Sequence, residues 1–251
     1  MKLHLKRCIR LALQSGGKYY RAASIGDPPF TLKSRNKSKS IVAPKAPGSG
    51  SVFVEIVGDD IYKSYLWLKG LPECPTVLDV GSNFGLFSCW LKLHVPNAKV
   101  TAVEPHPNVL PFLRENAKTF NFDVLPYAIT HEKGRASIDL TCDSTTASVF
   151  QANGINIPQD SDFSSVDGIE WADLFKYLPT PIDLLKCDCE GGEKWLLSKL
   201  SLLRLSHIIV MEYHFDHVDE SWVLEQLRLA GFNILNNSTG PYSGHVIAMQ
   251  M

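Results

Sequence analysis

Residues 76–85, T-V-L-D-V-G-S-N-F-G, give the strongest indication of the fold. The first five residues of this stretch form a short apolar run rich in β-branched side chains, which predicts a strand. Gly81 permits a tight turn, Gly85 lets the backbone run close to a bound ligand, and a helical pattern follows. The order of strand, turn and helix predicts a ligand site at this edge of an α/β sheet, where Asp79 at the strand tip would suit an ammonium group.

Strand and helix signals alternate outward from this stretch. Further strands are expected at residues 99–103, 122–129, 182–189 and 207–213, with helices around residues 113–120, 192–203 and 221–230. Near-continuous apolar strands between amphipathic helices predict a parallel sheet covered on both faces. Residues 232–235 and 245–249 are joined by a turn-rich link that is too short for a helix, so they should pair antiparallel. We therefore expect a doubly wound, mostly parallel sheet closed by a C-terminal hairpin.

Charge divides the chain into two unequal parts. Residues 1–48 hold eleven Lys and Arg against one acid, and the remainder holds fourteen bases and twenty-five acids. The first part is also rich in Ser, Gly and Pro, so residues 1–50 are predicted to be a basic, flexible arm. Residues 51–251 would form the folded domain, with an irregular insertion at about 130–177 over the carboxyl edge of the sheet. The polar residues Ser144, Thr145, Thr146 and Ser148 of that insertion could bind a polyhydroxyl acceptor or serve only as turn residues.

Composition narrows the class of protein. The chain has 251 residues, 45% of them hydrophobic, which suits one α/β core, and no apolar stretch reaches the length of a bilayer span. Neither a membrane span nor a cleaved signal is expected. Six scattered cysteines without a C-x-x-C pair favour reduced thiols and a cytoplasmic location over a zinc ribbon. Cys187 and Cys189 should project to one face of a core strand and pack there.

The turn after the first strand also constrains the cofactor. Its glycine spacing is not G-x-G-x-x-G, and Asp79 beside Gly81 would repel a dinucleotide pyrophosphate. Glu104 ends the next expected strand, where a carboxylate can accept hydrogen bonds from both hydroxyls of a ribose and would reject a 2′-phosphate. These residues favour a nucleoside cofactor that lacks phosphates.

Three motifs together resemble a known family. They are V-L-D-V-G-S-N-F-G-L-F at 77–87, A-V-E-P-H-P at 102–107 and I-D-L-L-K-C-D-C-E-G-G-E at 182–193. They resemble the FkbM-type methyltransferases over about Val77 to His214, and the third motif is the diagnostic one. Ser82 and Gly192 stand where the family usually has alanine, and Cys187 and Cys189 where it has apolar residues. The resemblance implies a class I (Rossmann-like) methyltransferase fold and O-methylation, by S-adenosylmethionine, of a hydroxyl on a sugar, a glycan or a glycosylated metabolite.

The resemblance also assigns site residues. The expected cofactor-binding set is Asp79, Gly81, Ser82, Asn83, Phe84, Gly85, Glu104, Pro105 and Asp188. The resemblance also places Asp188 and Glu190 beside the transferred methyl group, and the residues themselves add His214 to the expected catalytic set. His214 is a candidate base because it follows a strand at the same edge and imidazole titrates near working pH. Glu212, Asp216 and His217 cluster with it, but a divalent metal is not favoured because no ligand spacing is evident. Glu193 is interpreted as an acid that stabilises the start of a helix.

Alternative functions remain open from the sequence. An NAD-dependent oxidoreductase would also need an acid after the second strand, but this sequence lacks the G-x-G-x-x-G motif of such enzymes. The basic arm could bind nucleic acid or an anionic surface, either in an RNA ribose methyltransferase or in a non-catalytic binding protein. Small-molecule or glycan acceptors are the favoured partners.

Overall fold

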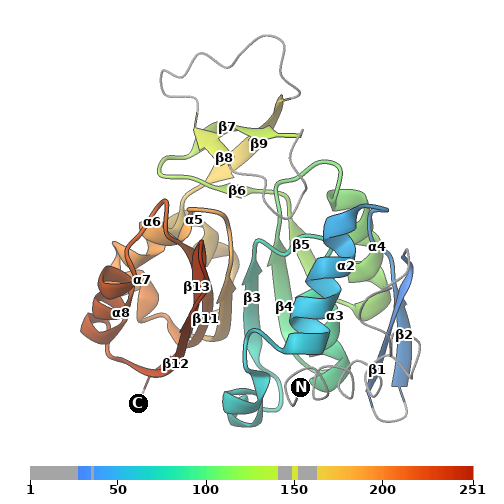
Figure 1. Cartoon of the computed structure of the whole chain (residues 1–251), viewed down its shortest axis with the longest axis horizontal. Helices are drawn as coiled ribbons and strands as arrows, with labels where there is room; N and C mark the ends of the chain where they lie inside the picture. Colours follow the sequence, from blue (N-terminus) through green and yellow to red (C-terminus); the bar gives the residue numbers. More distant parts are fainter. Residues whose placement is uncertain (1–27, 35–36, 141–148, 152–162, 251) are drawn as a thin grey trace.

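The computed structural model describes residues 28–34, 37–140, 149–151 and 163–250 (Figure 1). Its main sheet has seven strands in the order β12, β13, β11, β10, β3, β4, β5. In that order they span Phe232–Thr239, Ser243–Gln250, Ser206–His214, Ile182–Cys187, Thr76–Val80, Lys99–Val103 and Asp123–Leu125. The last five of these run parallel, and β13 pairs antiparallel with both β11 and β12. This is the predicted class I methyltransferase sheet, and the C-terminal hairpin is confirmed.

The strand order reverses at the middle of the sheet. From β3 the chain proceeds through β4 to β5 in one direction, and from β10 to β11 in the other. The carboxyl ends of β3 and β10 therefore form a topological switch point, the place where open α/β sheets bind ligands. The third quoted motif ends at this point, opposite the first.

Helices cover both faces of the sheet (Figure 1). Alternate residues of β10 and β11, such as Leu184 and Leu185, enter opposite hydrophobic cores, as expected of strands buried on both faces. One face carries α2 (Pro47–Phe53), α3 (Leu86–His94) and α4 (Leu110–Phe120), together with the π-helix η1 (Val54–Asp59) and the 3₁₀ turns η2 (Ser64–Leu66) and η3 (Leu68–Gly70). The other carries α5 (Trp171–Leu174), η4 (Phe175–Tyr177), α6 (Glu193–Leu197), α7 (Leu200–Leu203) and α8 (Glu220–Leu229).

The N-terminal segment corrects one prediction. Residues 30–34 and 37–50 are not a flexible arm, because β1 (Phe30–Ser34) and β2 (Lys37–Ile41) pair antiparallel and pack on the domain. Phe30, Leu32 and Ile41 are fully buried. They are few and lie among lysines and serines, so the composition of the segment does not predict that it packs on the domain. The buried amide of Asn116 fixes the segment, accepting a hydrogen bond from the Val42 N–H and donating to the Val42 carbonyl. Residues 1–27 lie outside the described residues, and their role stays a prediction.

A second, four-stranded sheet stands beside the main one, at the top of Figure 1. Its order is β6 (Ala128–Ile129), β9 (Phe163–Ile169), β7 (Gly134–Asp139) and β8 (Val149–Gln151). The segment predicted to be irregular thus contains strands, while Ser144, Thr145, Thr146 and Ser148 lie outside the described residues. The single strand expected at 122–129 is divided between the two sheets at Pro126, which has no N–H to donate. The helix expected at 192–203 is likewise two short helices, α6 and α7.

Among the residues that the structure describes, no helix is long and apolar enough to cross a membrane. The cysteines in this part of the chain, Cys74, Cys89, Cys187 and Cys189, are free thiols. Cys187 and Cys189 lie with their sulfur atoms 3.8 Å apart, on the same side of the chain.

Candidate active site

A cavity of about 790 Å³ opens at the switch point, at the carboxyl edge of the main sheet. Its lining comes mainly from the ends of β3 and β4, the ends of β10 and β11, the N-terminal segment around η1, the second sheet, and the turn between β12 and β13. Its polar lining residues include Glu55, Tyr62, Ser82, Asn83, Glu104, His106, Lys186, Asp188, Glu190, Glu212, His214, Asp216 and Ser243. The carboxylates outnumber the basic groups, so the cavity favours a cation over an anion.

Gly81 allows two strand ends to meet at the floor of the cavity. Its φ is +71°, and a Cβ atom there would lie 1.5 Å from the carbonyl oxygen of Asp188. The N–H of Asp188 donates to the carbonyl of Val80, which ties the same two segments together. Only glycine satisfies both the left-handed backbone and the contact, so the turn predicted at Gly81 is needed for the approach of β10 to β3.

Glu104 lies at the end of β4 with its carboxylate almost fully buried. One oxygen accepts the N–H of Asn83 and the other accepts the N–H of His106, both at 2.8 Å. Burial raises its pKa to about 7, although the two N–H donors and Lys186 partly oppose the shift. Each carboxylate oxygen can accept a further hydrogen bond, and Glu104 faces the cavity.

Lys186 is a buried ammonium group that joins the two strand ends. It donates to the carbonyls of Val80 and Gly81, and lies 3.5 Å from Asp79 Oδ1 and from Asp188 Oδ2. Burial would lower its pKa, but the two carboxylates outweigh that effect and raise it. Lys186 therefore stays charged and fixes the backbone of the turn.

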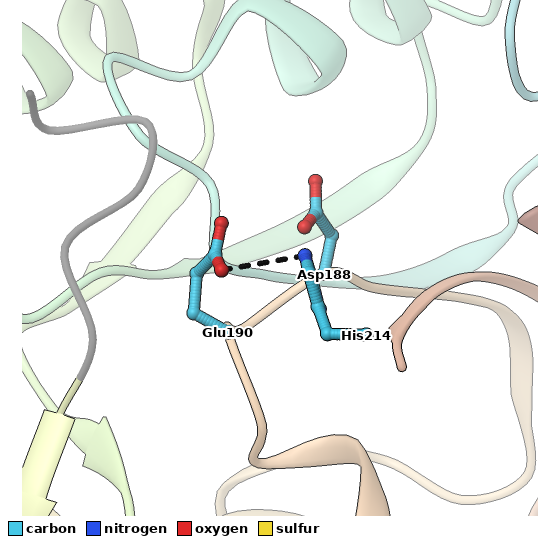
Figure 2. Close-up of side chains that lie close together, drawn as sticks. All are labelled: Asp188, Glu190 and His214. Atoms are coloured by element: carbon cyan, nitrogen blue, oxygen red, sulfur yellow. Dashed lines mark ion pairs between the residues drawn. The ribbon is translucent and has the colours of Figure 1, made fainter. Parts of the chain in front are cut away.

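Asp188, Glu190 and His214 converge on one wall of the cavity (Figure 2). The Nε2 atom of His214 lies 3.3 Å from a Glu190 oxygen, and its Nδ1 atom lies 3.6 Å from Glu193. Burial would lower the pKa of His214, but Glu193 and Glu190 outweigh it and raise the pKa to about 10. Burial raises the pKa of Glu190 to about 7. With nothing else bound, His214 is protonated at neutral pH and is a hydrogen-bond donor rather than a base.

The neighbouring wall holds a second imidazole and carboxylate pair. Glu212 Oε2 lies 3.1 Å from His245 Nε2, while its other oxygen is 3.9 Å from His214. Burial would raise the pKa of Glu212, but the bond from His245 outweighs it and lowers the pKa to about 2. Glu212 is therefore an anion throughout the neutral range.

The predicted site residues fall into two groups. Gly81, Ser82, Asn83, Glu104, Pro105, Asp188, Glu190 and His214 all line the cavity. Asp79 does not: it is fully buried behind Lys186, the ammonium group that it contacts, and it accepts a hydrogen bond of 2.6 Å from Ser88. Phe84 packs in the core against Phe30, and a Cβ on Gly85 would lie 2.7 Å from Leu113. Asp79, Phe84 and Gly85 therefore support the turn from the interior of the protein. The space beside Gly85 is taken by helix α4 and not by a ligand.

Sequence reasoning missed two residues of the site. Tyr62 belongs to none of the three motifs, yet its hydroxyl donates to Asp188. Glu193 begins helix α6 as expected, but its side chain is fully buried and accepts the N–H groups of Cys189 and Gly191. The G-G-E end of the third motif was the available signal for Glu193, whereas no local pattern identified Tyr62.

Comparisons with known proteins identify the family of the chain. A family model described as the methyltransferase FkbM domain matches residues 79–247. The methyltransferase sdnD of Sordaria araneosa is 37% identical over 65 residues, which are 26% of this chain and 24% of that protein. The release factor glutamine methyltransferase of Deinococcus radiodurans is 44% identical over 52 residues, 21% of this chain and 19% of that protein. The chain thus matches a quarter or less of the length of either relative.

Two solved methyltransferase structures align with most of the chain at low sequence identity. The precorrin-6y C5,15-methyltransferase of Geobacter metallireducens has a TM-score of 0.46 at 15% identity, covering 78% of this chain and 90% of its own. A SAM-dependent methyltransferase of Aquifex aeolicus has a TM-score of 0.42 at 17% identity, covering 78% and 93%.

Proposed function

The chain belongs to the FkbM methyltransferase family, and from that premise we propose that it transfers a methyl group from S-adenosylmethionine to a hydroxyl oxygen of a sugar, a glycan or a glycosylated metabolite. The observation that carries the proposal is the position of Glu104. This carboxylate faces the same cavity as Asp188, Glu190 and His214, so a ribose clamp and polar groups for an acceptor share one space.

The residues present fit this cofactor. The Glu104 carboxylate keeps acceptor capacity for the two ribose hydroxyls, since each oxygen receives only one backbone N–H. When bound, S-adenosylmethionine supplies a methyl group on a positively charged sulfur that leaves as a neutral thioether. The carboxylates of the cavity would attract that positive charge. They would attract the neutral product less, which would favour its release.

Asp188, Glu190 and His214 would handle the acceptor. In the sheet, β3 and its Gly81 turn lie between β4, which leads to Glu104, and β10, which leads to Asp188 and Glu190. The carboxylates of Asp188 and Glu190 can accept the hydrogen bond of a hydroxyl. One of these two carboxylates would take the proton of the hydroxyl as its oxygen accepts the methyl group that a bound cofactor would supply. Protonated His214 would hold Glu190 in place, and much of the rate would come from alignment of the reacting atoms.

The lining of the cavity also supports a neutral polyhydroxyl acceptor. Phe215 and Tyr242 line it with exposed rings, Tyr242 being 82% exposed, and such rings can stack on a sugar. Carboxylates such as Glu55 and Asp216 accept hydrogen bonds from hydroxyls and repel phosphates. The same charges speak against NAD and against an RNA acceptor, which would bring phosphates into this space.

Calorimetric titration with S-adenosylmethionine, with NAD as competitor, tests the proposal. The native chain and Asp216→Asn should bind equally, while Glu104→Ala should bind about ten- to a hundredfold more weakly, as expected for the loss of a charge-assisted hydrogen bond. Transfer of a labelled methyl group to glycans, and not to RNA, would then identify the acceptor class. Preference for NAD, or methylation of RNA alone, would overturn the proposal.

A further inference from the structure

We propose that Asp188, Glu190 and His214 form a binding site for a divalent cation on the wall of the cavity. One ligand atom from each residue lies within 4.8 Å of the other two, and all three side chains are partly buried (Figure 2). Two carboxylate oxygens and one imidazole nitrogen are a donor set that Mg²⁺ and Mn²⁺ accept. The sequence showed no ligand spacing because Asp188 and Glu190 follow β10, whereas His214 ends β11.

The atoms needed for coordination are available. Both polar contacts of Asp188, with Tyr62 and Lys186, involve Oδ2, and among the described residues its Oδ1 atom has no partner. In the same part of the chain, His214 is the one group in polar contact with the Glu190 carboxylate. A cation that replaces the proton of His214 Nε2 would take over its contact with Glu190 and would give up only the longer ion pair, of 3.9 Å, with Glu212.

The backbone is held in the shape that the site requires. Glu190 has a φ of +51°, in the left-handed region that a residue with a side chain seldom adopts, and Gly191 follows with a φ of +102°. Such strain persists only where the surroundings enforce it, and it concentrates at functional sites. Glu193 enforces it here, because its fully buried carboxylate accepts the N–H groups of Cys189 and Gly191.

Glu193 also orients the imidazole. It faces Nδ1 of His214, the nitrogen on the side away from Glu190. A histidine that binds metal through one nitrogen commonly directs the other to a carboxylate, which fixes the ring and its tautomer. Glu193, His214 and Glu190 follow the same order, with Glu193 at an ion-pair distance of 3.6 Å from Nδ1.

The role of the cation rests on the proposed function. Three protein ligands leave coordination positions open toward the cavity for water or an acceptor hydroxyl. A coordinated hydroxyl loses its proton to water more readily, and its oxygen is held in place for attack.

The direct test is a titration of the full chain with Mn²⁺, followed by the loss of the free-ion signal in electron paramagnetic resonance. We expect saturable binding of one Mn²⁺ per chain, competition by Mg²⁺, and a nitrogen coupling from His214 in the pulsed spectrum. Glu190→Gln and Asp188→Asn should each weaken Mn²⁺ binding by about tenfold or more. Loss of a group that only supports a metal ligand already weakens binding about tenfold, and loss of a ligand should cost no less. Glu55→Gln, which removes a carboxylate of the same cavity outside the cluster, should bind as the native chain does.

Several outcomes would overturn the site: no saturable binding, unchanged binding by a Glu190→Gln protein whose circular dichroism is native, or bound Mn²⁺ without nitrogen coupling. Calorimetry with S-adenosylmethionine on the same samples separates the two proposals. Cofactor binding without Mn²⁺ binding would reject the cation site alone, and Mn²⁺ binding without cofactor binding would reject the proposed function alone.

Discussion

The hydroxyl of Tyr62 donates a hydrogen bond of 3.0 Å to Oδ2 of Asp188 across 126 positions of sequence. Tyr62 lies before the range matched by the family model, which begins at residue 79, and Asp188 lies in its most diagnostic motif. The N-terminal segment therefore completes the wall of the cavity in addition to covering the core. Because Tyr62 is buried beside Phe87 and His245, its hydroxyl has little freedom to point elsewhere.

Tyr62→Phe should lower kcat for methyl transfer about tenfold and leave the Kd for S-adenosylmethionine unchanged. The reason is the loss of one hydrogen bond to a charged group, which contributes about 1.5–3 kcal/mol, at a residue on the acceptor side of the cavity. Steady-state kinetics and calorimetry measure the two quantities. Tyr242→Phe, at an exposed ring of the same cavity, is the control and should keep native kcat. A weaker Kd with unchanged kcat would assign Tyr62 to the cofactor instead.

Lys186→Met should destabilise the protein by about 3–5 kcal/mol, because it leaves the fully buried Asp79 and the partly buried Asp188 without their shared counter-ion. Urea unfolding measures the change, and adding Asp79→Asn should restore part of it. Lys199→Met is the matched control: Lys199 is 45% exposed, 3.7 Å from Glu170, and its loss should cost about 1 kcal/mol or less. Equal losses in the two variants would show that the buried pair is not special.

Gly81→Ala should be far more damaging than Gly231→Ala. Both glycines have a positive φ, +71° and +95°, so both substitutions incur about 1–2 kcal/mol of backbone strain. A Cβ at Gly231 meets nothing within 4 Å, whereas one at Gly81 would lie 1.5 Å from the Asp188 carbonyl oxygen. Thermal unfolding of the two variants compares the costs, and a similar loss in Tm for both would mean that the contact between β3 and β10 yields easily.

The sequence predicted what is local and periodic. The strand ending at Val80, the turn at Gly81 and the antiparallel pairing of β12 with β13 all follow from residues close together in the chain. It failed where distant segments combine. Phe30 and Ile41 are too few to predict a hairpin from the sequence, because what holds the hairpin is the distant core in which they are buried.

The site was predictable to the same degree. The motifs identified Glu104, Asp188 and Glu190 because family patterns record residue types at fixed spacing. They could not show that Asp79 faces Lys186 and not the cavity, since burial depends on β10 packing beside β3. The Tyr62 contact required the path of the N-terminal segment, which no periodicity encodes.

Glu104 should make the affinity for S-adenosylmethionine depend on pH. The pKa of Glu104 is raised by burial from an ordinary value of 4.5 to about 7, and Asp79 raises it further. The N–H groups of Asn83 and His106 and the Lys186 ammonium lower this pKa, but burial outweighs them. Only the carboxylate accepts hydrogen bonds from both ribose hydroxyls. Affinity for S-adenosylmethionine should therefore rise about tenfold from pH 6 to pH 8, as the ionised fraction rises. Glu104→Gln should bind about ten- to a hundredfold more weakly at pH 8 and lack this rise, so its profile reports the titration of the cofactor itself.

The raised pKa of Glu104 should affect the stability of the cofactor-free protein in the opposite direction: stability should fall as pH rises. A carboxyl group whose pKa is raised on folding favours the folded state below its unfolded pKa of 4.5, and that contribution is lost as pH rises through about 7. The free energy of unfolding of the native chain should therefore fall relative to Glu104→Gln between pH 5 and pH 8. Urea unfolding of both proteins at each pH measures the difference. A constant difference, together with an affinity that ignores pH, would mean that Glu104 is already ionised at pH 5 and that its burial is offset by the donors around it.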